Sequence, residues 1–287
     1  MASLVDFHMH STASDGKDSP RELWEKIKGM GMRSFALTDH DTIEGARAME
    51  RFVTNDADVK ISFVRGIEFS CITPVGKCHI LGYRYDWDNK DFTEVLNKGV
   101  ALRHKKLEQR LTFLKDEYNI EFAEKDVDAM RKMDSVGKPH LGELMVKMGI
   151  AASTQEAIKN YIDKCPTLDS RVPAEDVIAG IISAGGIPCW AHPYGGVGES
   201  RVEGEKFKNQ LNYLLNAGLK ALECYYSRYT KNEVDSLVEH AKKNGLYISG
   251  GSDYHGRKNY FPIGTLNADD IAIDAKNLSI CGQFGFS

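Results

Sequence analysis

Histidines and carboxylates recur at the ends of short apolar runs along this chain. His8 and His10 form a His-x-His pair directly after the first run. Residues i and i+2 of a strand point to the same side, so both imidazoles can face one ion. Later runs end in, or lie beside, further polar residues: Asp39-His40, Glu68, His79, His192 and Asp253-Tyr254-His255. Burying so many ionisable groups in one pocket would be prohibitive without cations, so the pattern predicts a metal centre.

The donor types indicate which metals and which chemistry to expect. The set consists of imidazole and carboxylate, which suits Zn, Mn or Fe, and it needs no cysteine. The six cysteines are scattered and include no CxxC pair. The candidate ligands outnumber what one ion can use, so two or three divalent ions are implied. Clustered divalent ions are typical of phosphoester hydrolysis, because they activate water and neutralise phosphoryl and leaving oxygens.

Strand and helix patterns alternate around these residues. The expected strands are residues 4–8, 34–37, 61–67, 79–83, 187–191, 219–224 and 246–249. Most are non-alternating, as in parallel strands buried on both faces, and the ends of such strands share one face of a barrel. Ser19-Pro20 and Gly31 bound a helix, and Asp41 is expected to cap the next one. Pro74 and Gly76 indicate a hairpin turn between Cys71 and Cys78.

The alternation stops between about residues 98 and 171, where the pattern is helical. Helices are expected over 98–118, 124–133, 140–148 and 154–162. This stretch holds 14 Lys/Arg and 12 Asp/Glu, a net of +2, against 23 minus 29, or −6, for the rest. We therefore expect an α-helical insertion over 98–171 in a β/α body formed by 1–97 and 172–287.

The overall composition limits the classes of partner. The net charge is −4 with 42% hydrophobic residues, which is globular and lacks the basic field needed for long nucleic acid or membrane surfaces. No apolar stretch is long enough to span a bilayer, and no signal peptide is recognisable. Unpaired cysteines in a chain of this length favour a cytoplasmic protein.

Seven segments resemble motifs of the polymerase-and-histidinol-phosphatase (PHP) family. They are Asp6-Phe7-His8-Met9-His10-Ser11, Ser14-Asp15-Gly16, Leu37-Thr38-Asp39-His40-Asp41, Gly66-Ile67-Glu68-Phe69-Ser70, Cys78-His79-Ile80-Leu81-Gly82-Tyr83, Trp190-Ala191-His192-Pro193 and Gly251-Ser252-Asp253-Tyr254-His255-Gly256. The resemblance implies a distorted seven-stranded (β/α) barrel of PHP type with a trinuclear site. It assigns His8, His10, Glu68 and Asp253 to one ion. Glu68, His79 and His192 would hold a second ion, and Asp15, His40 and His255 a third.

The insertion resembles the helical cap of a PHP subgroup that acts on nucleotides. Arg103, Gly137-Lys138-Pro139-His140-Leu141 and the segment 156–161 carry this likeness. The subgroup includes phosphatases of nucleoside 3′,5′-bisphosphates and exonucleases that shorten RNA from its 5′ end. Six residues are candidates for phosphate binding, three in the cap and three after barrel strands: Arg103, Lys138, His140, Arg201, Arg228 and Arg257.

The resulting hypothesis is a metal-dependent phosphoesterase that attacks a nucleotide phosphate with a metal-bridging hydroxide. Its expected catalytic residues are Glu68, Asp253 and His255, its substrate a small phosphorylated nucleotide or short oligonucleotide. Alternatives are a histidinol-phosphate phosphatase, an amidohydrolase-like C–N hydrolase and a noncatalytic metal-stabilised module. His104 and His240 are expected to be structural, and Glu223 either supports the site or makes a core hydrogen bond.

Overall fold

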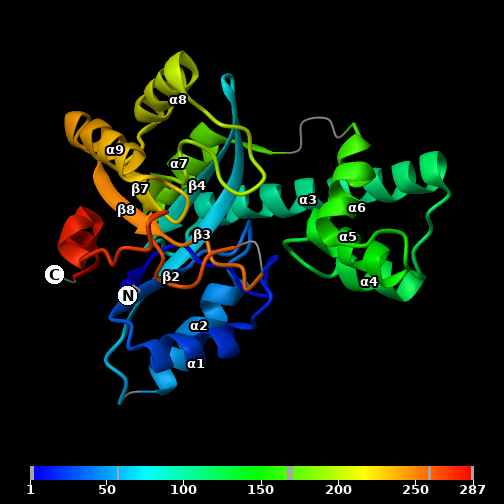
Figure 1. The fold of residues 1–287 in the computed structure, drawn as a ribbon, viewed down its shortest axis with the longest axis horizontal. Coiled ribbons are helices and arrows are strands. Elements are labelled where there is room, and N and C mark those ends of the chain that lie inside the picture. The colour runs from blue at the N-terminus through cyan, green and yellow to red at the C-terminus, as the bar shows by residue number, and fades with distance from the viewer. Residues whose placement is uncertain (1–2, 57, 167–170, 258–259, 286–287) are drawn as a thin grey trace.

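Seven strands form a nearly closed barrel in the computed structural model, which describes residues 3–56, 58–166, 171–257 and 260–285 (Figure 1). Their order around the barrel is β1 (Val5–Asp6), β2 (Ser34–Leu37), β3 (Ser62–Thr73), β4 (Gly76–Tyr83), β6 (Ile187–Trp190), β7 (Ala221–Tyr226) and β8 (Tyr247–Gly251). A short β5 (Val172–Pro173) pairs with β3. Backbone bonds from Phe7 N–H to Gly250 O (3.1 Å) and from Asp253 N–H to His8 O (2.8 Å) join β8 to β1. The barrel predicted from the sequence is confirmed.

The fourth strand runs against the others. β3 and β4 form the hairpin expected from Pro74 and Gly76, with Thr73 opposite Gly76, and β4 also pairs antiparallel with β6. The expectation of a barrel of parallel strands is therefore wrong at this strand. Because β4 is reversed, its beginning lies at the face where the parallel strands end. His79, near the start of β4, thereby joins residues that follow the other strands.

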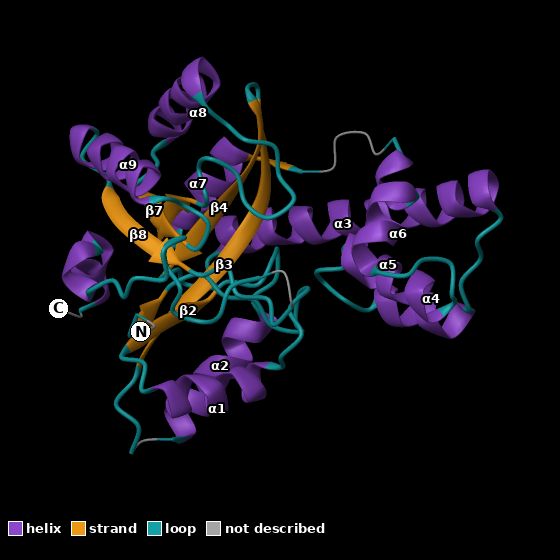
Figure 2. Cartoon of the chain, viewed as in Figure 1, coloured by secondary structure: helices purple, strands orange, loops and turns teal. Residues whose placement is uncertain are grey.

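Helices lie along the outside of the barrel strands (Figure 2). They are α1 (Pro20–Met30), α2 (Glu44–Asn55), α7 (Ala174–Ser183), α8 (Gly204–Ala217) and α9 (Lys231–Lys243). α1 begins with the expected capping box of Ser19 and Glu22 and ends at Gly31, whose φ of 66° is left-handed. Two short 3₁₀ helices, η2 (Ala275–Asn277) and η3 (Ser279–Phe284), follow near the C-terminus.

Asp41 does not cap α2, contrary to the expectation from sequence. The N-cap of α2 is Ile43, which makes no side-chain cap bond. Asp41 has a φ of 47° and is buried, with its carboxylate accepting hydrogen bonds from the Ser70 N–H and from Arg103. A buried guanidinium satisfies a carboxylate better than exposed helix N–H groups do, so this contact prevails.

Helices between β4 and β5 form a helical lobe beside the barrel (Figure 1). Its elements are α3 (Lys90–Tyr118), α4 (Glu124–Arg131), α5 (Lys138–Lys147), α6 (Thr154–Asn160) and the 3₁₀ helix η1 (Ile162–Lys164). α3 starts at Lys90 instead of Lys98, because Asn89 caps it by accepting from the Phe92 N–H. Leu107, Leu114, Leu141 and Met145 belong to a hydrophobic cluster separate from the barrel core. Among the described helices, none combines the length and apolar character that a membrane-spanning helix needs.

Candidate metal centre

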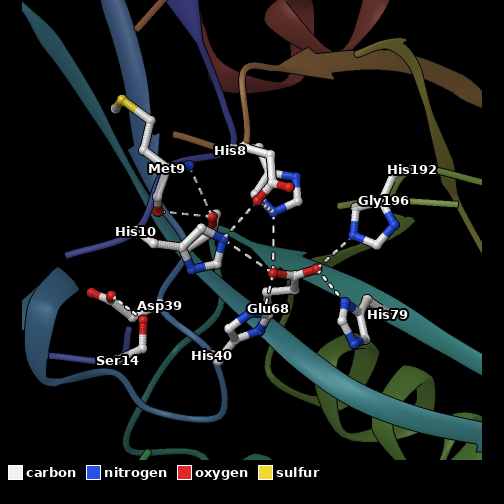
Figure 3. Close-up of polar contacts among 12 residues, drawn as sticks. His8, Met9, His10, Ser14, Asp39, His40, Glu68, His79, His192 and Gly196 are labelled. Atoms are coloured by element: carbon white, nitrogen blue, oxygen red, sulfur yellow. Dashed lines mark hydrogen bonds and ion pairs between the residues drawn. The ribbon is translucent and has the colours of Figure 1, made fainter. Parts of the chain in front are cut away.

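The carboxylate of Glu68, on β3, is fully buried at the centre of the site (Figure 3). Five imidazoles point a nitrogen at it: His8, His10, His40, His79 and His192. Its Oε2 lies 3.1 Å from the nearest nitrogen of each of the first three. Its Oε1 lies 2.8 Å from His79 Nδ1 and 3.0 Å from His192 Nε2. One carboxylate thus faces two groups of imidazoles, one group at each of its oxygens.

The chain after β1 alternates between core and site. Phe7 and Met9 are buried in hydrophobic clusters, and His8 and His10 are directed to the carboxylates. Asp253 Oδ1 lies 3.5 Å from His8 Nε2 and 3.3 Å from His10 Nε2. His8, His10, Glu68 and Asp253 together form a group that could hold a metal ion. This is the set that the family resemblance assigns to one ion.

A second group gathers around Asp15. His255 Nε2 lies 3.2 Å from Asp15 Oδ1, and His40 Nε2 lies 4.0 Å from the same oxygen. His255 Nδ1 donates to the Asp253 carbonyl at 2.8 Å, so Nε2 is the nitrogen that faces Asp15. These three residues and His10 form another possible ion site. The structure brings all nine expected ligands to one end of the barrel.

Two further carboxylates contact these imidazoles from the other side. Glu223, fully buried on β7, lies 2.9 Å from His8 Nδ1 and accepts the His192 backbone N–H at 2.7 Å. Of the two roles left open for it, support of the site is the one seen. Glu199 lies 3.1 Å from His192 Nδ1 and was missed, because it stands in a loop after β6 and ends no apolar run.

The unsatisfied atoms of the site fit a metal centre. Six atoms are buried without a hydrogen bond of suitable geometry to any residue that the structure describes: both ring nitrogens of His10 and of His79, His40 Nδ1 and Asp15 Oδ1. Leaving several such atoms unpaired is costly, and a divalent ion would satisfy them. The nitrogen and oxygen donors suit Zn, Mn or Fe.

Burial and the neighbouring charges shift the pKa values of the imidazoles and carboxylates in the site. Burial alone lowers the pKa of His10, but the carboxylates of Asp253 and Glu68 raise it to about 9. Burial would raise the pKa of Glu68, but the positive charges of His40 and His8 hold it well below its ordinary value. Burial lowers the pKa of His40 to about 3. Cations entering this site would therefore displace protons from imidazoles.

A cavity of about 760 Å³ lies between the metal centre and the helical lobe. Seven basic residues line it: Arg103, Lys106, Arg110, Lys138, Arg171, Arg228 and Arg257. Arg103 Nε donates to Asp41 Oδ2 at 2.6 Å and its Nη2 donates to Ser70 Oγ at 3.1 Å. Arg257 donates to the Asp15 carbonyl at 2.7 Å. These contacts hold the guanidinium groups of Arg103 and Arg257 in the cavity wall next to the metal centre.

Two of the expected phosphate-binding residues do not line this cavity. Arg201 forms ion pairs with Glu203, two residues along its own segment, and with Glu233 on α9. It borders a separate depression with Tyr194. His140 Nδ1 accepts the Gly137 N–H at 3.0 Å and acts as a cap for α5.

Three cavity residues were not expected from the sequence. Lys106 and Arg110 follow Arg103 along α3, and Arg171 precedes β5. On a long amphipathic helix such residues are usually part of a solvated face, so their spacing gave no functional signal. His104, as expected, is structural, since its Nε2 donates to the Met133 carbonyl at 2.8 Å.

The comparisons with known proteins agree with this geometry. A family model described as PHP domain matches residues 6–164, more than half of the chain. A 5′-3′ exoribonuclease of Haemophilus influenzae is 28% identical over 93% of both chains. A 3′,5′-nucleoside bisphosphate phosphatase of Chromobacterium violaceum is 26% identical, covering 88% of this chain and 87% of the relative.

The fold is also found among solved structures. A protein of Chromobacterium violaceum described as an amidohydrolase with bound sulfate superposes with a TM-score of 0.82 at 21% identity, covering 99% of this chain and 96% of that one. With its barrel, its ordered ligand motifs and the family match together, this chain belongs to the PHP family.

Proposed function

We propose that this protein hydrolyses a phosphate ester of a nucleotide: the 3′-phosphate of a nucleoside 3′,5′-bisphosphate, or a terminal ester of a short oligonucleotide. The observation that carries the proposal is Glu68, a single buried carboxylate between two groups of imidazoles at the floor of a cavity with basic walls. The exoribonuclease and bisphosphate phosphatase among its relatives support a nucleotide substrate.

The metal centre is proposed to hold two or three divalent ions, Mn, Fe or Zn. Residues on the two sides of Glu68 and around Asp15 would hold them: His8, His10, Asp15, His40, Glu68, His79, His192, Asp253 and His255. Bound ions would supply Lewis-acid activation of water and would offset the charge on phosphoryl oxygens. The proposed catalytic residues remain Glu68, Asp253 and His255. Tyr226 donates to Asp253 Oδ2 at 2.8 Å, which directs Oδ1 toward the imidazoles.

The cavity wall supports a substrate with more than one phosphate. Arg103, Lys106 and Arg110 line the cavity from successive turns of α3, and at 1.5 Å per residue the row extends about 10 Å. Arg110 is only 7% exposed, and its Nε has no hydrogen-bond partner among the described residues. Burial and the charges of Arg103 and Arg171 lower the pKa of Lys106 to about 7. A second phosphate of the substrate would relieve this repulsion.

On the barrel side, Arg257 and Arg228 are proposed to contact the phosphate that is cleaved. Both line the cavity with His255 and Asp253. Lys138 pairs with Asp163 at the cap side of the same cavity. A nucleotide would therefore lie between a reacting end at the barrel and a binding end at α3.

A phosphate-release assay tests this function on the metal-loaded protein. The substrates are a nucleoside 3′,5′-bisphosphate, the matching 3′-monophosphate, a short 5′-phosphorylated RNA and histidinol phosphate. We expect release from the bisphosphate or nucleotide release from the RNA, and none after Asp253→Ala. Turnover of histidinol phosphate alone would contradict the proposal and favour a histidinol-phosphate phosphatase. Turnover of no phosphate ester would contradict it as well and favour a C–N hydrolase or a noncatalytic module.

Matched lysine variants test the role of α3. Lys106→Met should raise KM for the bisphosphate about tenfold or more and leave the monophosphate unchanged, since loss of a charged partner costs roughly 1.5–3 kcal/mol. Lys105→Met is the control, because Lys105 is exposed and does not line the cavity. Equal effects of both variants would show that the wall does not bind a second phosphate.

We propose a reducing compartment such as the cytoplasm as the location. All six cysteines are free, and five are buried. Thiols in this state are usual where disulfides do not form.

A further inference from the structure

His79 and His192 each lie between two carboxylates. One ring nitrogen of each faces Glu68 Oε1, at 2.8 and 3.0 Å. The opposite nitrogens face Glu199, with His192 Nδ1 at 3.1 Å and His79 Nε2 at 3.8 Å. The two oxygens of Glu199 thus divide between the two rings. No other described carboxylate contacts both of these imidazoles from the cavity side.

Imidazole chemistry gives the two sides different roles. A neutral imidazole has one lone pair and one N–H, so a ring that binds an ion through one nitrogen donates from the other. The same arrangement exists at His8, whose Nε2 faces Glu68 and whose Nδ1 faces Glu223. Glu223 is fully buried, whereas the Glu199 side chain is 29% exposed at the cavity wall.

The loop after β6 is built to hold Glu199 in this place. The Gly195 N–H donates to the His192 carbonyl at 2.7 Å, and Gly195 has a φ of 104°. The Gly196 N–H donates to Glu199 Oε2 at 3.0 Å. A Cβ on Gly196 would lie 3.0 Å from His192 Nδ1, so the backbone itself packs against the ring (Figure 3). The turn therefore fixes the carboxylate and the imidazole together.

We propose that Glu199 is a positioning residue for the ion shared by Glu68, His79 and His192: it accepts the N–H of His192, and its second oxygen faces Nε2 of His79. Glu199 thereby selects the tautomer that offers a lone pair to the ion, and it sets the affinity of that ion alone. This inference rests on the proposed metal centre and adds a second supporting carboxylate to it, beside Glu223.

Zn²⁺ titration of the metal-stripped full-length chain tests the proposal independently of turnover. Partners of this kind typically change metal affinity 10–100-fold. We therefore expect Glu199→Gln to weaken one Zn²⁺ by about 10–100-fold and to leave the stoichiometry and the other affinities unchanged. Glu203→Gln, a charge change in the same segment on a residue that pairs with Arg201, should match the wild type.

Two further measurements separate positioning from general damage to the loop. The visible spectrum of the Co²⁺ form should change in Glu199→Gln for one ion only. Gly196→Ala, which displaces the His192 ring without altering charge, should weaken the same ion. Circular dichroism with a chelator present should show the same fold for the wild type and Glu199→Gln.

The outcomes are distinct. Wild-type affinity for every ion in Glu199→Gln would overturn the inference and leave the proposed function intact. Complete loss of one ion would also overturn it, because Glu199 would then be a ligand itself. Failure of the wild type to bind any Zn²⁺, Mn²⁺ or Fe²⁺ would instead refute the proposed metal centre, and this inference with it.

Discussion

Replacing Arg103 by Ala should destabilise the protein strongly, because it leaves a buried carboxylate without its partner. Arg103 Nε is 2.6 Å from Asp41 Oδ2, and the two side chains are 11% and 3% exposed. After the substitution, the Ser70 N–H still donates to Asp41 Oδ1 at 2.9 Å, but the charged partner of the carboxylate is gone. Removing one member of a buried ion pair costs roughly 3–5 kcal/mol. The partial exposure of Arg103 places our expectation at about 3 kcal/mol.

The stability lost in Arg103→Ala should depend on pH. Burial would raise the pKa of Asp41, but the Arg103 charge holds it below its ordinary value. A carboxylate with a lowered pKa stabilises the fold above its unfolded pKa of about 4, and this stability is lost as the pH falls. The difference between wild type and Arg103→Ala should therefore be largest near neutral pH and shrink in acid.

Urea unfolding of the metal-free protein, followed by circular dichroism, measures the effect. Arg131→Ala is the matched control: Arg131 is 2.8 Å from Glu108 but 43% exposed, so its loss should destabilise the fold far less. Adding Asp41→Asn to Arg103→Ala should recover part of the loss. A cost of Arg103→Ala equal to that of Arg131→Ala, or one independent of pH, would refute the reasoning.

Three other perturbations follow from the site. Without metal, the raised pKa of His10, about 9 instead of 6.5, should stabilise the fold by about 3 kcal/mol, at about 1.36 kcal/mol per pKa unit. This stability is present below pH 6.5 and is lost as the pH rises through 9, so a urea midpoint that rises over this range would contradict the prediction. Gly251→Ala should prevent normal folding, since its Cβ would lie 2.2 Å from His8 Cβ, whereas Gly282→Ala meets open space; soluble yield and circular dichroism compare them. Zn²⁺ at a thousand times its Kd should stabilise the fold by about 4 kcal/mol over the chelated protein, and an unchanged Tm would show that no ion binds the folded state.

Much of the site could be predicted because its signals are local. A short apolar run that is followed by polar residues predicts a strand end from the local sequence alone, as at Leu37, which Asp39 and His40 follow closely. The barrel then brings such ends together whatever the exact strand lengths. This is why the nine expected ligands meet at one face although several strand boundaries differ by a few residues.

The residues that sequence reasoning missed depend on non-local geometry. Glu199 reaches His192 only because two glycines fold the loop back, and no periodicity reports such a path. Asp41 precedes a helix, so local rules predicted a cap, but Arg103, 62 residues later, competes for its carboxylate. Arg110 resembles any charged residue of an amphipathic helix until the cavity beside it is known.

The continuity of α3 makes its length a determinant of specificity. This helix of 29 residues leaves the barrel and enters the helical lobe without interruption. Each residue of a helix turns the chain by about 100° and advances it by 1.5 Å. One residue inserted between Arg103 and Lys106 would thus rotate Lys106, Arg110 and the lobe beyond them by more than a quarter turn around a fixed barrel. Insertions or deletions in this helix should therefore be tolerated only when they add or remove whole turns. Other length changes would turn the basic side chains of α3 away from the cavity and leave the metal-binding residues of the barrel in place.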